Sequence, residues 1–278
     1  MFFRTDLATE LPKGVSLSAK DVAVHTHQNG AVTLTYTHIR TAAGEKAVGK
    51  PRGQYVTMDV PPLSDSDREL REHATLLGQE LKRLLPSEGC VLVVGLGNET
   101  ITPDAVGPAT AKLVLATRHL GGEFARASGL TDLRPTAVVR AGVVGETGVE
   151  TAELIRGVCR TVDPAAVIAV DALAAASPER LGTTVQMSDG GIAPGSGVGN
   201  RRVALDRQTL GVPVIAVGVP TVVDAAGLYD HGGEALRYMM VTPREIDLIV
   251  HRCARLIAMS IHAALHPAYD PLELLALA

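Results

Sequence analysis

Tryptophan is absent from this chain, and phenylalanine and tyrosine are scarce, so aromatic residues make up only 3% of the 278 residues. So few rings exclude a stacking platform for nucleic-acid bases. The net charge of −4 gives no positive surface for binding nucleic acid directly. Aliphatic residues supply most of the 46% hydrophobic content, which is enough for the core of one large domain, or of a domain with an added lobe.

Cysteine is also rare. Cys90, Cys159 and Cys253 lie far apart in apolar surroundings and form no CxxC pair, which predicts free thiols in a reducing compartment. The opening residues "MFFRTDLATE" lack the apolar stretch of a signal peptide. No run approaches the roughly 18 consecutive apolar residues of a membrane helix. We therefore expect a cytoplasmic protein without a membrane segment.

Several common catalytic motifs are missing. The chain has no HExxH, no cluster of His and Cys at ligand spacing and no GxSxG. The glycine-rich segment "GGIAPGSGVGNRR" lacks the GK[ST] of a P-loop, and neither it nor "GLGNET" matches GxGxxG. We expect no metal and no cofactor, and the missing GxGxxG argues against a dinucleotide site.

The first part of the chain, residues 7–85, is predicted to be a β-rich lobe with a linking helix. Alternation over Val32–Ile39 and the run "QYVTMDV" predict two strands, and "TAAGEKAVGKPRG" between them is expected to be a turn-rich connection. The segment "PPLSDSDREL" begins a helix, with Ser64 or Asp65 as its cap, and Pro86 ends it. Its leucines and Ala74 recur on one face.

Residues 86–278 are predicted to form an α/β core, a mainly parallel sheet sandwiched by helices. The short apolar runs are "CVLVVGLG", "TAVVRAG", "AAVIAVDA", "TTVQMSDGG" and "VPVIAVGVP". They lack polar alternation, as expected of strands buried on both faces. A last long helix is expected after a capping box of Thr242 and Glu245, with Pro243 in its first turn.

Acidic residues follow the predicted strands. In open parallel sheets the crevice beyond the carboxyl ends of the strands holds the functional residues. The strand ends place Asn98, Asp104, Asp171, Asp189 and Asp224 along this edge. Three of the aspartates have ordinary explanations, because an aspartate also caps a helix or braces a glycine turn.

Asp171 is harder to explain in this way. It follows the fully apolar "AVIAV", where an unpartnered carboxylate costs several kcal/mol or takes up a proton. Two aspartates close together share one proton near neutral pH. The ionised member can activate a water and the protonated member can donate to a carbonyl oxygen, which are the two requirements of peptide hydrolysis. Which member is base and which acid stays open, because such a pair titrates as a unit.

The glycine-rich segment offers backbone N–H groups for an oxyanion or a phosphate. Ser196 within it is a conceivable nucleophile, but no histidine is positioned by a motif to activate it. Arg201 and Arg202 either favour an acidic substrate or are surface residues. The residues expected to bind or support a substrate are Asn98, Asp189, Gly195, Ser196, Gly197 and Asn200.

Longer blocks carry a resemblance to a known family. They are "VGLGNETITPDAVGPATAKLVLATRHL", "GVVGETGVET", "AVIAVDALAAASPERLGTTVQMSDGGIAPGSGVGNRR", "LGVPVIAVGVPTVVDA" and "VTPREIDLIVHRCARLIAMSIHAALHP". In this order, with "RTDLATE" at the start, they resemble the spore germination protease family almost end to end.

The resemblance implies an endopeptidase of the forespore or spore core. It would begin the degradation of small acid-soluble spore proteins at germination, as an atypical aspartic peptidase. The two key aspartates of the family match Asp104 and Asp171. The family also implies a zymogen and a homotetramer, and a fold related to hydrogenase maturation proteases.

The first residues match the self-processing that the resemblance implies. Substrates of the family are cut after an acidic residue and before an aliphatic residue followed by alanine. "TDLATE" offers Asp6, Leu7 and Ala8 in that order, so residues 1–6 are a possible propeptide. Such a propeptide is shorter than usual for the family, the chain is shorter between "VVDA" and "VTPRE", and Ala141 stands where proline is usual.

Two alternatives remain. In a peptidase of the hydrogenase-maturation type, the same carboxylates would hold a metal such as nickel, although carboxylates without histidine or cysteine are poor nickel ligands. A nucleotide-binding or purely structural α/β protein would rest on the glycine-rich segments alone.

Overall fold

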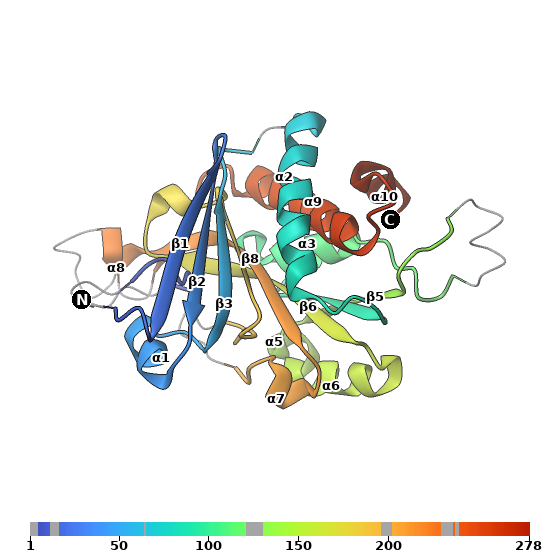
Figure 1. The fold of residues 1–278 in the computed structure, drawn as a ribbon, viewed down its shortest axis with the longest axis horizontal. Coiled ribbons are helices and arrows are strands. Elements are labelled where there is room, and N and C mark those ends of the chain that lie inside the picture. The colour runs from blue at the N-terminus through green and yellow to red at the C-terminus, as the bar shows by residue number, and fades with distance from the viewer. Residues whose placement is uncertain are drawn as a thin grey trace.

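The computed structural model of the 278-residue chain describes residues 5–11, 17–63, 65–120, 130–195, 202–228, 236 and 239–278 (Figure 1). The strands are β1 (Val22–Asn29), β2 (Val32–Ile39), β3 (Gly53–Asp59), β4 (Val91–Leu96), β5 (Thr136–Gly142), β6 (Ala166–Ala175), β7 (Thr184–Ser188), β8 (Val214–Asp224) and β9 (Met240–Val241). The α-helices are α1 (Ala42–Val48), α2 (Asp67–Leu84), α3 (Val106–Lys112), α5 (Val144–Thr147), α6 (Thr151–Val162), α7 (Arg207–Leu210), α8 (Ala225–Leu228), α9 (Ile246–Leu265) and α10 (Pro271–Leu277). Two 3₁₀ turns are η1 (Thr102–Asp104) and η2 (Pro178–Arg180).

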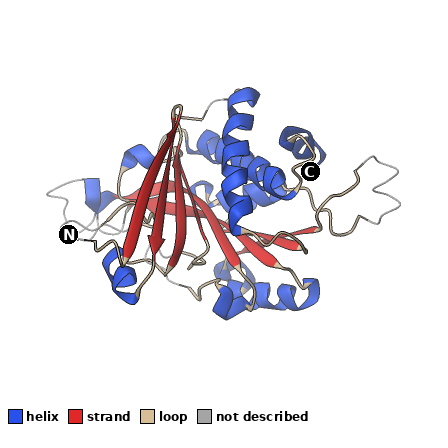
Figure 2. Cartoon of the chain, viewed as in Figure 1, coloured by secondary structure: helices blue, strands red, loops and turns tan. Residues whose placement is uncertain are grey.

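Figure 2 shows the described strands, in red, as one sheet. Their order is β1-β2-β3-β7-β8-β6-β4-β5, and β9 pairs with β8. The α/β fold is confirmed. The sheet is mixed, because only β8, β6, β4 and β5 run parallel to one another. β7 is antiparallel to both of its neighbours. Its connection from β6, residues 176–183, is shorter than the dozen or so residues that a parallel crossover needs.

The parallel strands are buried on both faces, as their apolar runs predict. On β6, Ala166, Ile168 and Val170 belong to the core under α2 and α9, while Val167 and Ala169 belong to a second core with α6. Figure 1 shows α2, α3, α9 and α10 on one side of the sheet and α5, α6 and α7 on the other. The helices therefore sandwich the parallel part of the sheet.

The N-terminal strands extend this sheet. β1, β2 and β3 are antiparallel and join the core through the pairing of β3 with β7. The predicted turn-rich connection between β2 and β3 instead contains α1, which Thr41 caps by accepting from the Gly44 N–H. A good N-cap and a glycine in the left-handed conformation at Gly49 delimit this short helix.

Two helix starts differ from the sequence prediction. α2 is capped by Ser66, whose side chain accepts from the Glu69 N–H, and Asp65 instead pairs with Arg252; Ser64 lies outside the described residues. α9 begins at Ile246 without a side-chain cap, because the Thr242 hydroxyl donates to the Thr221 carbonyl of β8. Tertiary contacts have taken the side chains that local spacing assigns to caps.

α9 is the one described helix long and apolar enough to cross a membrane by length and composition, and 67% of its most apolar window is buried. It packs against α2 in the main core, as a core helix of this composition does. Cys253 on this helix is buried, and burial raises the pKa of its thiol to about 12. Cys159 is buried and Cys90 partly buried, and all three thiols are free.

Candidate active site

The crevice predicted at the strand ends lies where β4 stops. β4 pairs with β6 only as far as Gly95 and Val170, whereas β6 continues beside β8 to Ala175. Asp171 is therefore the first residue of β6 without a β4 partner. The sequence places it at a strand end; the structure places it inside β6, because pairing with β8 alone sustains the strand for four more residues, 172–175.

Asp171 is only 5% exposed. Its Oδ1 accepts from the Ala172 N–H at 2.9 Å. Burial, and then the carboxylates of Asp104 and Asp6, raise the pKa of Asp171 well above its ordinary value, and the Ala172 N–H opposes this. The fold therefore favours the protonated form of this carboxyl more than water does.

Asp104 reaches the same place from the turn after β4. It is the last residue of η1, and its Oδ2 accepts from the Asn98 N–H at 2.6 Å. It does not cap α3, which begins at Val106 with no side-chain cap. Burial raises the pKa of Asp104, Glu146 adds to this and the Asn98 N–H opposes it. The carboxylate thus holds its own loop in place beside Asp171.

Two glycines explain how this turn comes so close to the sheet. Gly97 has φ of 106°, and a Cβ there would lie 2.1 Å from the Asp104 carbonyl oxygen. A Cβ at Gly107 would lie 2.4 Å from the carbonyl oxygen of Val170 on β6. The glycines of "GLGNETITPDAVGP" therefore let the backbone that carries Asp104 rest against the backbone that carries Asp171.

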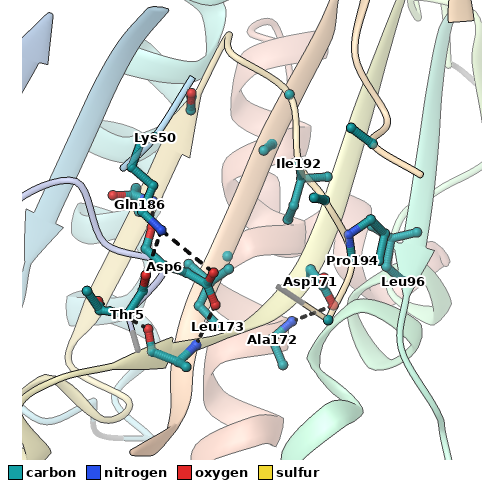
Figure 3. Close-up of a pocket in the computed structure, with 18 of the residues that line it drawn as sticks. Thr5, Asp6, Lys50, Leu96, Asp171, Ala172, Leu173, Gln186, Ile192 and Pro194 are labelled. Carbon is teal, nitrogen blue, oxygen red and sulfur yellow. Dashed lines mark hydrogen bonds and ion pairs between the residues drawn. The ribbon is translucent and has the colours of Figure 1, made fainter. Parts of the chain in front are cut away.

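Asp104 and Asp171 both line a cavity of about 1730 Å³. Pockets for small molecules usually measure about 300–1,000 Å³, so this volume suits a polypeptide segment better. Figure 3 shows part of it, with Thr5, Asp6, Lys50 and Gln186 toward one side and Asp171, Pro194 and Leu96 toward the other. The site thus combines a buried and a half-buried carboxyl with space for an extended chain.

The other predicted site residues divide into three groups. Asn98 and Gly195 line the cavity. Asp189 is exposed and is not among the described lining residues; it accepts from the Gln54 N–H at 2.6 Å and braces the end of β7. Ser196, Gly197 and Asn200 lie outside the described residues.

Two further side chains of the sequence analysis are placed by the structure. Asp224 accepts from the Ala226 N–H at the start of α8, which is the ordinary capping role. Arg202 lines the cavity and pairs with Glu150 at 3.5 Å; Arg201 lies outside the described residues. Asp104 and Asp171 are thus the two of the four strand-end aspartates that the fold brings together at the cavity.

The predicted processing site lies in this cavity. The Asp6 N–H donates to the Ala174 carbonyl at 2.8 Å, and the Ala174 N–H donates to Asp6 Oδ2 at 2.9 Å. Leu7 and Ala8 are each 1% exposed. The segment around the Asp6–Leu7 bond therefore runs along the end of β6, the strand that carries Asp171.

Sequence reasoning missed two residues that hold this segment, Lys50 and Gln186. Gln186 is buried in β7 between apolar neighbours, so the signal that singled out Asp171, a polar residue inside an apolar strand, also marks it. Lys50 follows α1 in a loop, and no local pattern distinguishes it from an exposed lysine. Among the described residues, no group of three or more His, Cys, Asp or Glu side chains is placed to hold a metal ion.

Comparison with known proteins finds related sequences. A family model described as germination protease matches residues 7–238. The chain is 37% identical to a germination protease of Caldanaerobacter subterraneus over 98% of this chain and 96% of the relative. It is 35% identical to one of Clostridium acetobutylicum over 98% and 97% of the two chains. It is 43% identical to one of Priestia megaterium over 81% and 64%.

A weaker structural likeness is to a [NiFe] hydrogenase maturation protease from Thermococcus kodakarensis, with a TM-score of 0.39 and 17% identity over 66% of this chain and 98% of the other. Two of the three relatives match 98% of the chain, and the family model covers most of it. The chain therefore belongs to the germination protease family.

Proposed function

We propose that this protein is a sequence-specific endopeptidase that begins the degradation of small acid-soluble spore proteins at germination, with Asp104 and Asp171 activating the attacking water. The observation that carries the proposal is the buried carboxyl of Asp171, beside Asp104, in a cavity large enough for a peptide. Burying a carboxyl beside other carboxylates lowers the stability of the fold. Carboxyls with such perturbed pKa values are concentrated at active sites.

The environments of the two carboxyls suggest their roles. Asp171 is more deeply buried, and burial favours its neutral form. Asp104 is half-buried, and the Asn98 N–H that it accepts at 2.6 Å opposes the rise of its pKa, so we take it as the carboxyl that ionises first. In the resting enzyme the shared proton thus lies on Asp171, and Asp104 takes a proton from water.

Hydrolysis then proceeds by general acid–base catalysis. Water attacks the carbonyl carbon while Asp104 removes its proton and Asp171 donates to the carbonyl oxygen. When the tetrahedral intermediate collapses, the C–N bond breaks, the proton on Asp104 passes to the leaving amine, and the hydroxyl returns its proton to Asp171. The pair ends with the one proton with which it began.

The protein is also proposed to be made as a zymogen that cuts itself between Asp6 and Leu7. Support comes from the position of that segment along β6, inside the cavity that holds the aspartates. The resemblance of the sequence to the family further supports a homotetramer and a location in the forespore or spore core. Sedimentation of the purified protein would check the oligomeric state.

The test uses Asp104→Asn and Asp171→Asn, with Asp247→Asn as the matched control because Asp247 is exposed on α9 and is not among the described lining residues. Each protein is incubated with an acid-soluble spore protein, and the products are mapped by mass. Both active-site variants should lose at least about 10³-fold in rate, as general acid–base and electrostatic contributions imply. A folded variant that cuts at the wild-type rate removes that residue from the mechanism.

A metal-dependent reaction is the alternative outcome. Elemental analysis of the purified active protein, with activity measured before and after chelation, distinguishes the two. Stoichiometric metal together with loss of activity on chelation would replace the acid–base mechanism with a metal-assisted one.

A further inference from the structure

The side-chain amide of Gln186 holds the two peptide groups on either side of Leu7. Its Nε2 donates to the Asp6 carbonyl oxygen at 3.0 Å, and its Oε1 accepts from the Ala8 N–H at 2.7 Å. Gln186 is only 7% exposed. One amide offers a donor and an acceptor in one plane, so it grips an extended backbone as a neighbouring strand would, regardless of the side chains.

The side chain of Asp6 is held separately. The Ala174 N–H donates to its Oδ2 at 2.9 Å, and Lys50 Nζ lies 3.9 Å from its Oδ1 (Figure 3). Lys50 also donates to the carbonyl oxygen of Thr5 at 2.6 Å. A cation and a backbone N–H therefore converge on an acidic side chain at this position, while the lysine also binds the chain before it.

Apolar contacts define the next two positions. Leu7 lies in a buried cluster with Leu173, Ala175 and Val223 at the ends of β6 and β8. Ala8 lies in a different buried cluster, which includes Val48 and Tyr55. An aliphatic residue followed by a small residue is thus what this part of the cavity encloses.

The pairing of the strands puts this segment in line with Asp171. Gln186 on β7 is opposite Gly218 on β8, and Gly218 is opposite Asp171 on β6. Directly paired residues point to the same face of a sheet, and neighbouring strands are about 4.8 Å apart, so the Cα atoms of Gln186 and Asp171 are about 10 Å apart. The residue paired with both is a glycine, which places no side chain between the amide and the carboxyl.

We propose that Gln186 and Lys50 form the substrate-recognition site of this enzyme: Gln186 binds the carbonyl of the scissile peptide bond and the N–H one residue beyond it, and Lys50 recognises the acidic side chain before the bond. The proposal rests on the endopeptidase activity proposed above. The segment Thr5–Glu10 then occupies the site as a first, intramolecular substrate. Peptides bound from solution use the same groups after it has left.

The Gln186 donor also has a catalytic consequence. Attack on the carbonyl carbon moves negative charge to the oxygen that Nε2 contacts, so this hydrogen bond strengthens in the transition state. Removing one donor of this kind typically lowers kcat by about 10²–10³-fold. If Gln186 only anchors the N-terminal segment, its loss instead frees the cavity and leaves cleavage of an added peptide unchanged or faster.

The experiment measures cleavage of an added peptide, FRTDLATELP, taken from residues 3–12 of this chain. The full-length variants are Gln186→Met, Gln186→Glu and, as the control, Gln54→Met, which changes an exposed glutamine on the neighbouring strand β3. We expect kcat/KM to fall at least about 100-fold in Gln186→Met and to stay within about twofold in the control. In Gln186→Glu, kcat/KM should fall similarly at neutral pH, and its ratio to the wild-type value at the same pH should recover in part on acidification, because only the protonated carboxyl can donate.

The role of Lys50 is tested by the preference of the enzyme for a peptide with Asp over one with Asn before the scissile bond. Wild type, Lys50→Met and the control Lys20→Met, an exposed lysine, are compared on FRTDLATELP and on FRTNLATELP. The preference of the wild type for Asp over Asn should fall at least about tenfold in Lys50→Met, since the half-buried cation 3.9 Å from Asp6 Oδ1 favours the charged side chain over the neutral one. An unchanged preference overturns the role of Lys50, and this result stands even if Gln186→Met fails to fold.

The possible failures are distinguishable. A wild type that cuts neither the peptide nor its own Asp6–Leu7 bond contradicts the proposed endopeptidase activity. An active wild type together with Gln186 variants of unchanged or increased activity on the added peptide contradicts the recognition site alone.

Discussion

The hydroxyl of Thr221 on β8 donates to the carbonyl of Pro103 at 2.6 Å. Thr221 is fully buried, and Pro103 immediately precedes Asp104 in the turn η1. The bond therefore ties the loop that carries one aspartate to the strand that pairs with the other, because β8 lies beside β6. It thus helps to hold Asp104 in position relative to Asp171.

Thr221→Val tests this tie. The substitution keeps the volume but leaves the Pro103 carbonyl without its donor, at a cost of about 1–3 kcal/mol in the free energy of unfolding. Because Asp104 is then held less firmly, kcat should fall about tenfold or more with KM little changed. The control is Thr75→Val, which removes a similar hydroxyl-to-carbonyl bond on the exposed face of α2. Equal kinetics in the two variants would contradict a positioning role.

Gly97→Ala should disrupt the same loop from the other side. A Cβ at φ of 106° would lie 2.1 Å from the Asp104 carbonyl oxygen, so the turn must move. We expect a loss of more than about 2 kcal/mol in stability and nearly complete loss of activity. Gly30→Ala, at φ of 60° in the β1–β2 turn with nothing within 4 Å of its Cβ, should lose only about 1 kcal/mol and remain active. Thermal melting and peptide cleavage measure both.

Stability should depend on pH through Asp171. Its pKa is raised in the folded state above the ordinary 3.8, so the fold favours the protonated carboxyl. The contribution of Asp171 to the free energy of unfolding is fully present below pH 3.8. It is lost as the pH rises from 3.8 toward the raised pKa, by about 1.4 kcal/mol per pH unit. Asp171→Asn cannot ionise and should therefore be more stable than wild type at about pH 8 but not below the ordinary pKa. Urea unfolding at both pH values checks this, and a stability difference independent of pH would contradict it.

The acid limb of the pH–rate profile should report Asp104 as the base. Burial first and then Glu146 raise its pKa, so activity should fall on acidification at a pH above the ordinary 3.8. Glu146→Gln removes one cause and should move this limb to lower pH, whereas Glu153→Gln, exposed on α6, should not. If the acid limb stays in place in Glu146→Gln, another group is the base.

The sequence accounts well for the parts of the fold that rest on local chemistry. Apolar runs locate the five core strands, and the leucine pattern before Pro86 locates α2, because burial imposes these patterns residue by residue. Helix caps and strand directions are less well predicted. Ser66 rather than Ser64 or Asp65 caps α2, and β7 runs antiparallel, because a distant arginine and the length of a connection decide them.

By itself the sequence placed Asp104 and Asp171 among four aspartates at one edge of an α/β sheet, since parallel strands deliver their carboxyl ends together, and the family resemblance singled out these two. Only the tertiary structure decided which residues hold the Asp6–Leu7 segment in the same cavity as those carboxyls. Gln186 and Lys50 lie far from Asp6 in the chain, and meet it because β7, β8 and the loop after α1 fold around one cavity. Contacts of this kind leave no periodic trace in a sequence, because they join single residues across strands rather than repeated positions along one element.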